Sequence, residues 1–131
     1  MLAASYSEKG TSMFVQTLDE LITAGRQKVF CDGALRSVRF LLKGDGMGFS
    51  MSDVRCGAGL DEVLWYKHHW EANYIVTGEG LLEDMSTGQT WPVGPGVIYV
   101  VGPKDRHRIR TDTELHAISI FNPPLSADTT L

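Results

Sequence analysis

Short apolar and β-branched runs recur along most of the chain, and Gly, Pro or Asp residues separate each run from the next. The pattern predicts seven or eight short strands, at residues 37–42, 48–54, 72–77, 81–84, 90–93, 97–101, 106–110 and 115–121. A parallel sheet needs crossover helices between its strands, and these gaps leave no room for them. The spacing therefore predicts an all-β fold, an antiparallel sandwich or barrel.

One short helix is predicted ahead of these strands. Thr17 and Glu20 have the spacing of a capping box, in which the hydroxyl accepts from a main-chain N–H and the carboxylate reaches back to another. A short apolar stripe begins at Leu18, and Gly25 is suited to end the helix.

A chain of 131 residues suits one domain, because single cores run to about 100–200 residues. Residues 1–14 are small and polar without a sustained pattern, and we predict a flexible N-terminal arm there. A boundary further along would cut the strand series. We therefore predict a single domain over residues 15–125 and a short C-terminal tail over residues 126–131.

Alternation along three predicted strands places polar side chains on otherwise apolar faces. Glu71 shares a face with Asn73, Tyr99 shares one with two valines, and His107 shares one with Ile109. Buried polar groups of this kind must pair with one another or bind a ligand. The pattern therefore predicts that a carboxyl, a phenol and an imidazole converge in the interior.

Charge and composition exclude several kinds of function. The chain has 12 basic and 16 acidic residues, a formal net charge of −4 and no basic cluster, so we expect no nucleic-acid partner. No apolar run approaches the roughly 18 residues of a membrane span, and the N-terminus lacks the basic and apolar regions of a secretion signal. Cys31 and Cys56 are interpreted as free, unreactive thiols, and we expect a cytoplasmic protein with no membrane association.

The segment YKHHWEANYIVTGEGLLED resembles the ectoine synthases, a metal-dependent family of the cupin superfamily. Further matches are MGFS, TGQTWPVGPGVIY, DRH and FNPPL, and together the likeness covers roughly residues 15–125 in order. The resemblance implies a cupin-type, jelly-roll-like antiparallel β-barrel. It also implies a hydro-lyase that takes a small-molecule substrate, N4-acetyl-L-2,4-diaminobutyrate, to ectoine and water. Ectoine is a compatible solute made under osmotic stress.

The same resemblance implies a metal site and two residues for proton transfer. Matched by residue type, the family's metal ligands fall on Glu71, Tyr99 and His107. A carboxylate, a phenolate and an imidazole suit Fe(II), and other divalent metals bind the same donors. Three ligands also leave positions open for substrate. Tyr66 and His69 match positions linked to activity, and we assign the catalytic proton transfers to them.

Four more residues are implied to surround the substrate and the metal. Arg39 matches a basic position suited to holding the substrate carboxylate, and a structural ion pair is the alternative interpretation. Phe121 matches an aromatic pocket wall, and Ser119 stands where the family has a cysteine, so both are expected to contact substrate. Asp105 is expected to orient the imidazole of His107, which follows two residues later.

The chain departs from the family pattern within the expected pocket. Val63 and Trp65 replace two histidines, Val54 replaces a threonine, and Leu35 stands at an expected tryptophan. The family's C-terminal segment, which folds over the pocket, is expected to be missing or shorter. Two alternatives follow: a divergent paralogue with altered activity, such as amide or amidine hydrolysis or the reverse reaction, and a non-catalytic cupin that binds a small molecule.

Each candidate ligand also has a plainer interpretation. Alone, Glu71 would be a solvated strand-edge residue, Tyr99 a packing residue and His107 a polar loop residue. Only the matched set within the family framework favours a metal site. His68 and His116 are expected at the surface or an interface.

Two of the predicted strands are apolar on both faces. These are residues 97–101 and 115–121, and something must cover their outer sides. A second subunit is the obvious cover, and the family resemblance also implies a homodimer.

Overall fold

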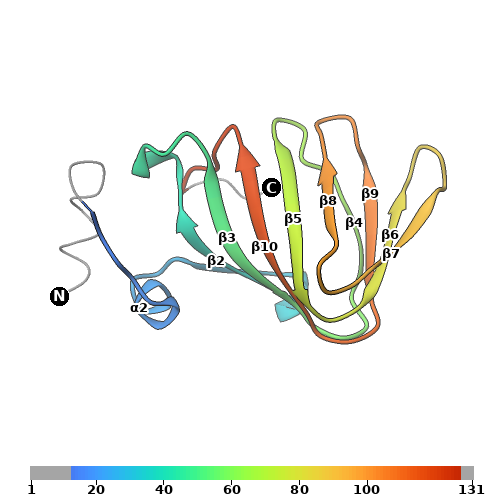
Figure 1. Ribbon diagram of the computed structural model, residues 1–131, viewed down its shortest axis with the longest axis horizontal. Coiled ribbons are helices and arrows are strands. Elements are labelled where there is room, and N and C mark those ends of the chain that lie inside the picture. The colour runs from blue at the N-terminus through green and yellow to red at the C-terminus, as the bar shows by residue number, and fades with distance from the viewer. Residues whose placement is uncertain (1–12, 128–131) are drawn as a thin grey trace.

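The computed structural model describes residues 13–127, and these form ten strands and one short α-helix. In Figure 1 the strands run from β2 at the left to β7 at the right, with α2 at the left end. The elements are α2 (Leu18–Thr23), β1 (Gln27–Phe30), β2 (Leu35–Leu41), β3 (Ser50–Cys56), β4 (Asp61–Leu64), β5 (Trp70–Thr77), β6 (Gly80–Asp84), β7 (Thr90–Val93), β8 (Ile98–Val101), β9 (His107–Thr111) and β10 (Leu115–Asn122), with 3₁₀ turns η1 (Cys31–Gly33) and η2 (Lys43–Asp45).

Two antiparallel sheets make up the fold. One has six strands in the order β1–β2–β3–β10–β5–β8, and the other has four in the order β4–β9–β6–β7. All the strand pairs are antiparallel, so the all-β fold predicted from the spacing and the jelly-roll-like form implied by the family resemblance are confirmed.

Two strands escaped the sequence pattern, although every predicted segment overlaps a strand. The missed strands are β1, with the sequence QKVF, and β4, with the sequence DEVL. Each has only two apolar residues after charged or polar ones, which is too short a run to show alternation. β1 pairs with β2, and β4 pairs with β9, so pairing with a neighbour defines these strands rather than a local signal.

The helix begins and ends where the sequence predicts. The Glu20 main-chain N–H donates to Thr17 Oγ1 at 3.2 Å, and the Thr17 N–H donates to Glu20 Oε1 at 2.8 Å, so both capping-box bonds form. Gly25 follows the helix with a φ of +83°, in the left-handed region that glycine adopts without strain at helix ends.

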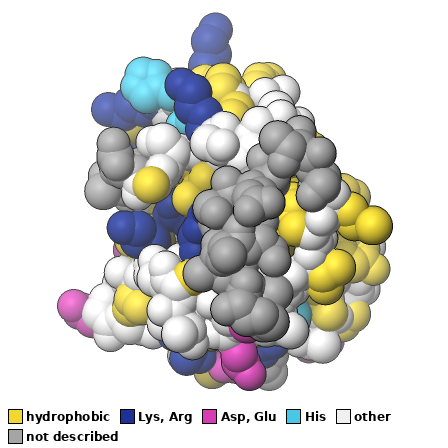
Figure 2. All heavy atoms as spheres, turned by 90° about the vertical axis from the view of Figure 1, so that its left-hand side faces the viewer, with side chains coloured by type: hydrophobic (Ala, Val, Ile, Leu, Met, Phe, Trp, Pro, Cys, Tyr) yellow, Lys and Arg dark blue, Asp and Glu magenta, His cyan; other side chains and the backbone are white. Residues whose placement is uncertain are grey.

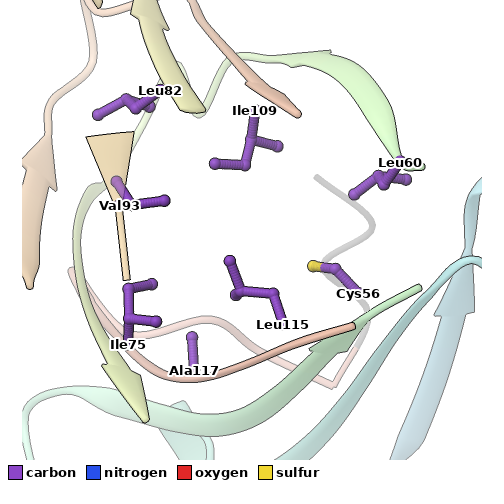
Figure 3. Packing of buried hydrophobic residues seen from close by; sticks show 8 residues of the cluster. All are labelled: Cys56, Leu60, Ile75, Leu82, Val93, Ile109, Leu115 and Ala117. Atoms are coloured by element: carbon purple, nitrogen blue, oxygen red, sulfur yellow. The ribbon is translucent and has the colours of Figure 1, made fainter. Parts of the chain in front are cut away.

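The apolar core lies between the two sheets. Eight buried residues from both sheets point toward one another in Figure 3: Cys56, Leu60, Ile75, Leu82, Val93, Ile109, Leu115 and Ala117. A second buried cluster consists of Leu42, Tyr66, Val101, Phe121 and Leu125. Leu64 and Tyr99 pack against both clusters, so the two are continuous across the interior.

Residues 1–12 and 128–131 lie outside the described residues. The predicted N-terminal arm falls almost wholly on the first of these ranges and the predicted tail partly on the second, so the domain limits stay predictions. Within the part of the chain that the structure describes, no helix has the length and apolar character needed to cross a membrane.

Two glycines in strand connections differ in how closely other atoms approach them. Gly78 and Gly88 have positive φ values of +92° and +74°, but a Cβ on Gly78 would lie 2.2 Å from the carbonyl oxygen of Glu114, whereas one on Gly88 meets nothing within 4 Å. We expect Gly78→Ala to lower the free energy of unfolding by more than about 2 kcal/mol and Gly88→Ala by about 1 kcal/mol, measured by urea unfolding. Equal losses in the two variants would contradict this close approach.

Candidate functional site

A cavity of about 270 Å³ lies between the two sheets, walled by members of both apolar clusters. Polar side chains reach it from four strands of the six-stranded sheet, among them Arg39 from β2, Glu71 and Asn73 from β5, Tyr99 from β8 and Ser119 from β10. A few convergent polar groups in an otherwise apolar cavity are typical of a small-molecule site.

Glu71 lies on the cavity side of β5, as the alternation predicts. Its neighbours on that face, Asn73 and Ile75, are buried with it, whereas Tyr74 between them faces outward. Burial raises the pKa of the Glu71 carboxyl to about 7, and the nearby Asn73 side chain opposes that rise. Glu71 is 6% exposed, so its interpretation as a solvated edge residue is wrong.

Tyr99 faces the same cavity from the adjacent strand. β5 and β8 pair so that Asn73 lies opposite Tyr99 and Glu71 lies opposite Val101. Burial raises the pKa of the Tyr99 phenol well above its ordinary value, and the charge of Glu71 adds to the effect. The charge of Glu71 therefore makes ionisation of the Tyr99 phenol less favourable.

His107 projects from β9 of the opposite sheet, where it is buried. Its ring centroid lies 6.5 Å from that of Tyr99 and 5.7 Å from that of Tyr66. His107 does not line the main cavity. It lines a neighbouring one, and Tyr99 borders both. Burial lowers the pKa of His107, which favours the neutral ring.

The imidazole of His107 is held by Asp105, but not through the carboxylate. His107 Nδ1 lies 2.9 Å from the main-chain carbonyl oxygen of Asp105, whereas the Asp105 carboxylate accepts from the N–H of Gly102 at 2.7 Å. A carbonyl oxygen only accepts, so Nδ1 carries the hydrogen and Nε2 keeps a lone pair. The role of Asp105 in orienting the ring stays a prediction, now assigned to its backbone.

The donors of these three residues fit a divalent cation. His107 Nε2 is buried and has no hydrogen-bond partner among the described residues, while its other nitrogen is engaged as metal-binding histidines usually are. Within residues 13–127, no group of three His, Cys, Asp or Glu side chains could hold a metal. A site here would therefore depend on the phenol of Tyr99 as its third ligand.

Tyr66 and Phe121 line the cavity, and His69 contacts Phe121 without lining the cavity itself. The Phe121 ring lies edge-on to both others, with centroids 5.2 Å from Tyr66 and 6.0 Å from His69. His69 Nδ1 lies 2.7 Å from the carbonyl oxygen of Pro123, so this nitrogen donates and Nε2 is the lone-pair nitrogen of the neutral ring. The structure therefore brings Tyr66 and Phe121 together at the cavity and leaves His69 half-buried beside them.

Arg39 is the most unusual side chain of the cavity. It is 1% exposed, and none of its three guanidinium nitrogens has a hydrogen-bond partner among the described residues. No described carboxylate forms the structural ion pair that the sequence left open as an alternative. A buried, unpaired cation at a cavity wall is a strong indication of an anionic ligand.

Asn73 and Ser52, two polar residues of the six-stranded sheet, were not identified as site candidates from the sequence. The Ser119 hydroxyl donates to Asn73 Oδ1, while Asn73 Nδ2 and the hydroxyl of Ser52 are buried without a partner among the described residues. Alternation had placed Asn73 on the face of Glu71, and that signal alone could have identified it.

The residues that depart from the family pattern also line the cavity. These are Leu35, Val54, Val63 and Trp65. Trp65 is anchored from outside, because its indole N–H donates to the carbonyl oxygen of Pro103 at 2.7 Å. The departures therefore alter the wall of the site rather than remote surface.

The remaining candidates lie where the sequence predicts. His68 is exposed, and His116 faces away from the cavity with Nε2 2.6 Å from the Asp53 carboxylate. Cys31 and Cys56 are free thiols, and burial raises the pKa of Cys56 to about 12, so it stays protonated.

Comparison with known proteins gives a consistent result. Residues 13–130 match the sequence profile of the family described as ectoine synthase. An L-ectoine synthase of Desulfosudis oleivorans is 43% identical over 115 residues, which cover 87% of this chain and 88% of that protein.

Solved structures agree in fold. The crystal structure of ectoine synthase from P. lautus superposes with a TM-score of 0.80 at 36% identity, covering 87% of this chain and 80% of that one. A cupin domain from Schizosaccharomyces pombe matches with a TM-score of 0.58 at 14% identity, covering 67% of this chain and 64% of that one, and shows the fold alone.

Because Arg39 is buried without a partner among the described residues, we expect it to lower the stability of the protein when no substrate is bound. Without substrate, Arg39→Met should raise the free energy of unfolding by about 1–3 kcal/mol, because it removes a buried charge that has no partner. Arg36→Met on the same strand is the control, since the Arg36 side chain is 50% exposed and should change stability by less than about 0.5 kcal/mol. Urea unfolding measures both, and a clear loss of stability in Arg39→Met would contradict the prediction.

Proposed function

The chain belongs to the ectoine synthase family, and we propose that it closes N4-acetyl-L-2,4-diaminobutyrate to ectoine with loss of water. The observation that carries this proposal is the unpaired Arg39 guanidinium in the same cavity as Glu71 and Tyr99. A small amino acid with a carboxylate at one end and an acetamide at the other complements that arrangement, because its carboxylate supplies the partner that Arg39 lacks.

Glu71, Tyr99 and His107 would hold a divalent metal, and we propose Fe(II). The lone pair on His107 Nε2, the buried Glu71 carboxyl and the inward-facing Tyr99 phenol support this set. When bound, such a metal supplies Lewis-acid polarisation of the acetamide carbonyl.

Residues of the chain would carry out the proton transfers of ring closure. The α-amino nitrogen bonds to the acetamide carbon, the two amine hydrogens and the carbonyl oxygen leave as water, and the C=N bond of the cyclic amidine remains. We assign His69 as the base for the amine, since its Nε2 keeps a lone pair, and Tyr66 as the proton donor to the departing oxygen. Phe121 packs edge-on against both rings and helps to fix their positions.

We further propose that the protein works in the cytoplasm, making a compatible solute under osmotic stress, with no nucleic-acid partner. The acidic balance of the chain, 16 acidic against 12 basic residues, supports the last point. Activity in cell extracts and growth of a deletion strain at high osmolarity would check the cellular role.

A homodimer is proposed from the outer face of the six-stranded sheet. β8 is an edge strand of that sheet, and its Ile98 and Val100 are 64% and 56% exposed, beside the exposed Tyr74 and Ile120. Figure 2 shows exposed hydrophobic side chains gathered along its right-hand side. Apolar patches on strand faces are typical of subunit interfaces.

Product analysis tests the proposed reaction. The protein loaded with Fe(II) and given N4-acetyl-L-2,4-diaminobutyrate should form ectoine, followed by NMR. No ectoine at any protein concentration would contradict the proposal, and release of acetate with diaminobutyrate would support the hydrolytic alternative that the altered wall at Val54, Val63 and Trp65 raises.

Matched variants separate the roles within that experiment. Glu71→Ala should lose most of the bound metal and the activity, whereas Glu83→Ala, which removes a half-buried carboxylate on β6, should keep both. Tyr66→Phe and His69→Gln should keep the metal and lower kcat by about 10²- to 10⁴-fold. Unchanged metal content in Glu71→Ala would overturn the ligand assignment.

The dimer is tested by charge at the exposed edge. Ile98→Glu should shift sedimentation from dimer to monomer, because a carboxylate would be buried without a partner at the interface. Val29→Glu is the control, since Val29 is also exposed but lies on β1 at the opposite edge. A monomeric unsubstituted protein, or an unaffected dimer in Ile98→Glu, would contradict the proposal.

A further inference from the structure

One line of residues crosses the six-stranded sheet through five neighbouring strands and is polar throughout. Cross-strand pairing places each member directly opposite the next, in the order Arg39, Ser52, Ser119, Asn73 and Tyr99. Directly opposed residues of antiparallel strands point to the same face of the sheet. We call these five residues the polar row, and it faces the interior, since all but the half-buried Tyr99 are buried.

The neighbouring rows differ from this one. On one side the row begins with Ser37 and continues with the apolar residues Val54, Ala117 and Ile75. On the other side polar and apolar residues alternate, in the order Ser50, Phe121, Glu71 and Val101. Of these three rows, the polar row is therefore the one in which every member carries a hydrogen-bonding group.

Three members of the row carry polar atoms that the described part of the chain leaves unsatisfied. They are the guanidinium of Arg39, the hydroxyl of Ser52 and the amide nitrogen of Asn73. Each such buried group costs about 1–3 kcal/mol unless something pairs with it. Arg39 and Asn73 both line the cavity, so a ligand there is the natural partner.

The amide of Asn73 has a defined orientation. The Ser119 hydroxyl donates to Asn73 Oδ1, which leaves the two N–H bonds of Nδ2 as the free donors of this side chain. Asn73 lies two residues from Glu71 on the same face of β5 and directly opposite Tyr99 of β8. The free donor is thus held at the Glu71 and Tyr99 end of the cavity.

We propose that Asn73 is a specificity-determining residue that donates a hydrogen bond from Nδ2 to the acetamide oxygen of the substrate, and that Ser119 is the positioning residue that orients this amide. The inference rests on the proposed function. Adjacent strands lie about 4.8 Å apart, so Asn73 is one strand from Tyr99 but three from Arg39. Three spacings amount to about 14 Å between backbones, and the long Arg39 side chain, its contact with the carboxylate and the extended ligand together can span that distance within the cavity.

If Asn73 Nδ2 donates to a carbonyl oxygen of the ligand, ligands without that carbonyl should bind more weakly. The protein should bind N4-acetyl-L-2,4-diaminobutyrate more tightly than L-2,4-diaminobutyrate, which has the same carboxylate but no acetamide. Removing the Asn73 amide should abolish most of that difference, since only the acetylated ligand uses it.

Titration calorimetry with these two ligands tests the assignment. Asn73→Leu should weaken binding of the acetylated ligand by about 10- to 100-fold and that of diaminobutyrate by less than about twofold, with metal content unchanged. Ser119→Ala should weaken the acetylated ligand less, and the double variant should be no worse than Asn73→Leu, because Ser119 acts through Asn73. Ser50→Ala is the control: Ser50 is equally buried, but its hydroxyl accepts from the Leu125 N–H, so ligand binding should not change.

Asn73→Asp is a second variant with the shape of the original side chain. It keeps the oxygen that accepts from Ser119 and loses the N–H donor, so it should bind the acetylated ligand at least as weakly as Asn73→Leu does. Unchanged binding in either Asn73 variant would overturn the assignment. Loss of metal in Asn73→Leu would also overturn it, since the amide would then serve to orient Glu71 rather than to bind the ligand. Binding of the acetylated ligand by the unsubstituted protein without ectoine formation would overturn the proposed function alone. Absence of binding would overturn both.

Discussion

The burial of an unpaired guanidinium in an apolar-walled cavity is the constraint on which the rest of the site depends. Arg39 is 1% exposed and has no partner among the described residues. Holding a cation there requires favourable burial elsewhere, which the continuous apolar clusters between the two sheets provide. A ligand with a carboxylate would relieve this cost, so stability and substrate binding are coupled through one side chain.

Strand alternation lets the same elements serve the site and the surface. In β10, Ser119 and Phe121 face the cavity while Ile120 between them faces outward, and in β5 Glu71 and Asn73 face inward while Tyr74 does not. Because successive side chains point to opposite faces, a strand with polar groups inside can carry an apolar face outside. The polar row and the proposed subunit interface are therefore two sides of one sheet.

Apolar side chains surround the hydrogen-bonded pair of Asn73 and Ser119 in the cavity. Leu35 and Val54 of the six-stranded sheet and Val63 of the four-stranded sheet are among them. An apolar wall lowers the local dielectric and strengthens the hydrogen bonds that remain. A member of the ectoine synthase family with fewer polar wall groups can in this way rely on the donors of its sheet.

Most of the strands, the capped helix and the inward faces of Glu71, Tyr99 and His107 were predictable from the sequence, because period-two alternation and capping are local properties of the chain. Contacts between distant segments were needed to show that β1 and β4 are strands, that the backbone of Asp105 holds His107, and that Arg39 has no ion pair among the described residues. The polar row from Arg39 to Tyr99 could not be predicted from the sequence either. Its members lie far apart in the chain, and the register between strands arises from packing and hydrogen bonds across the whole sheet.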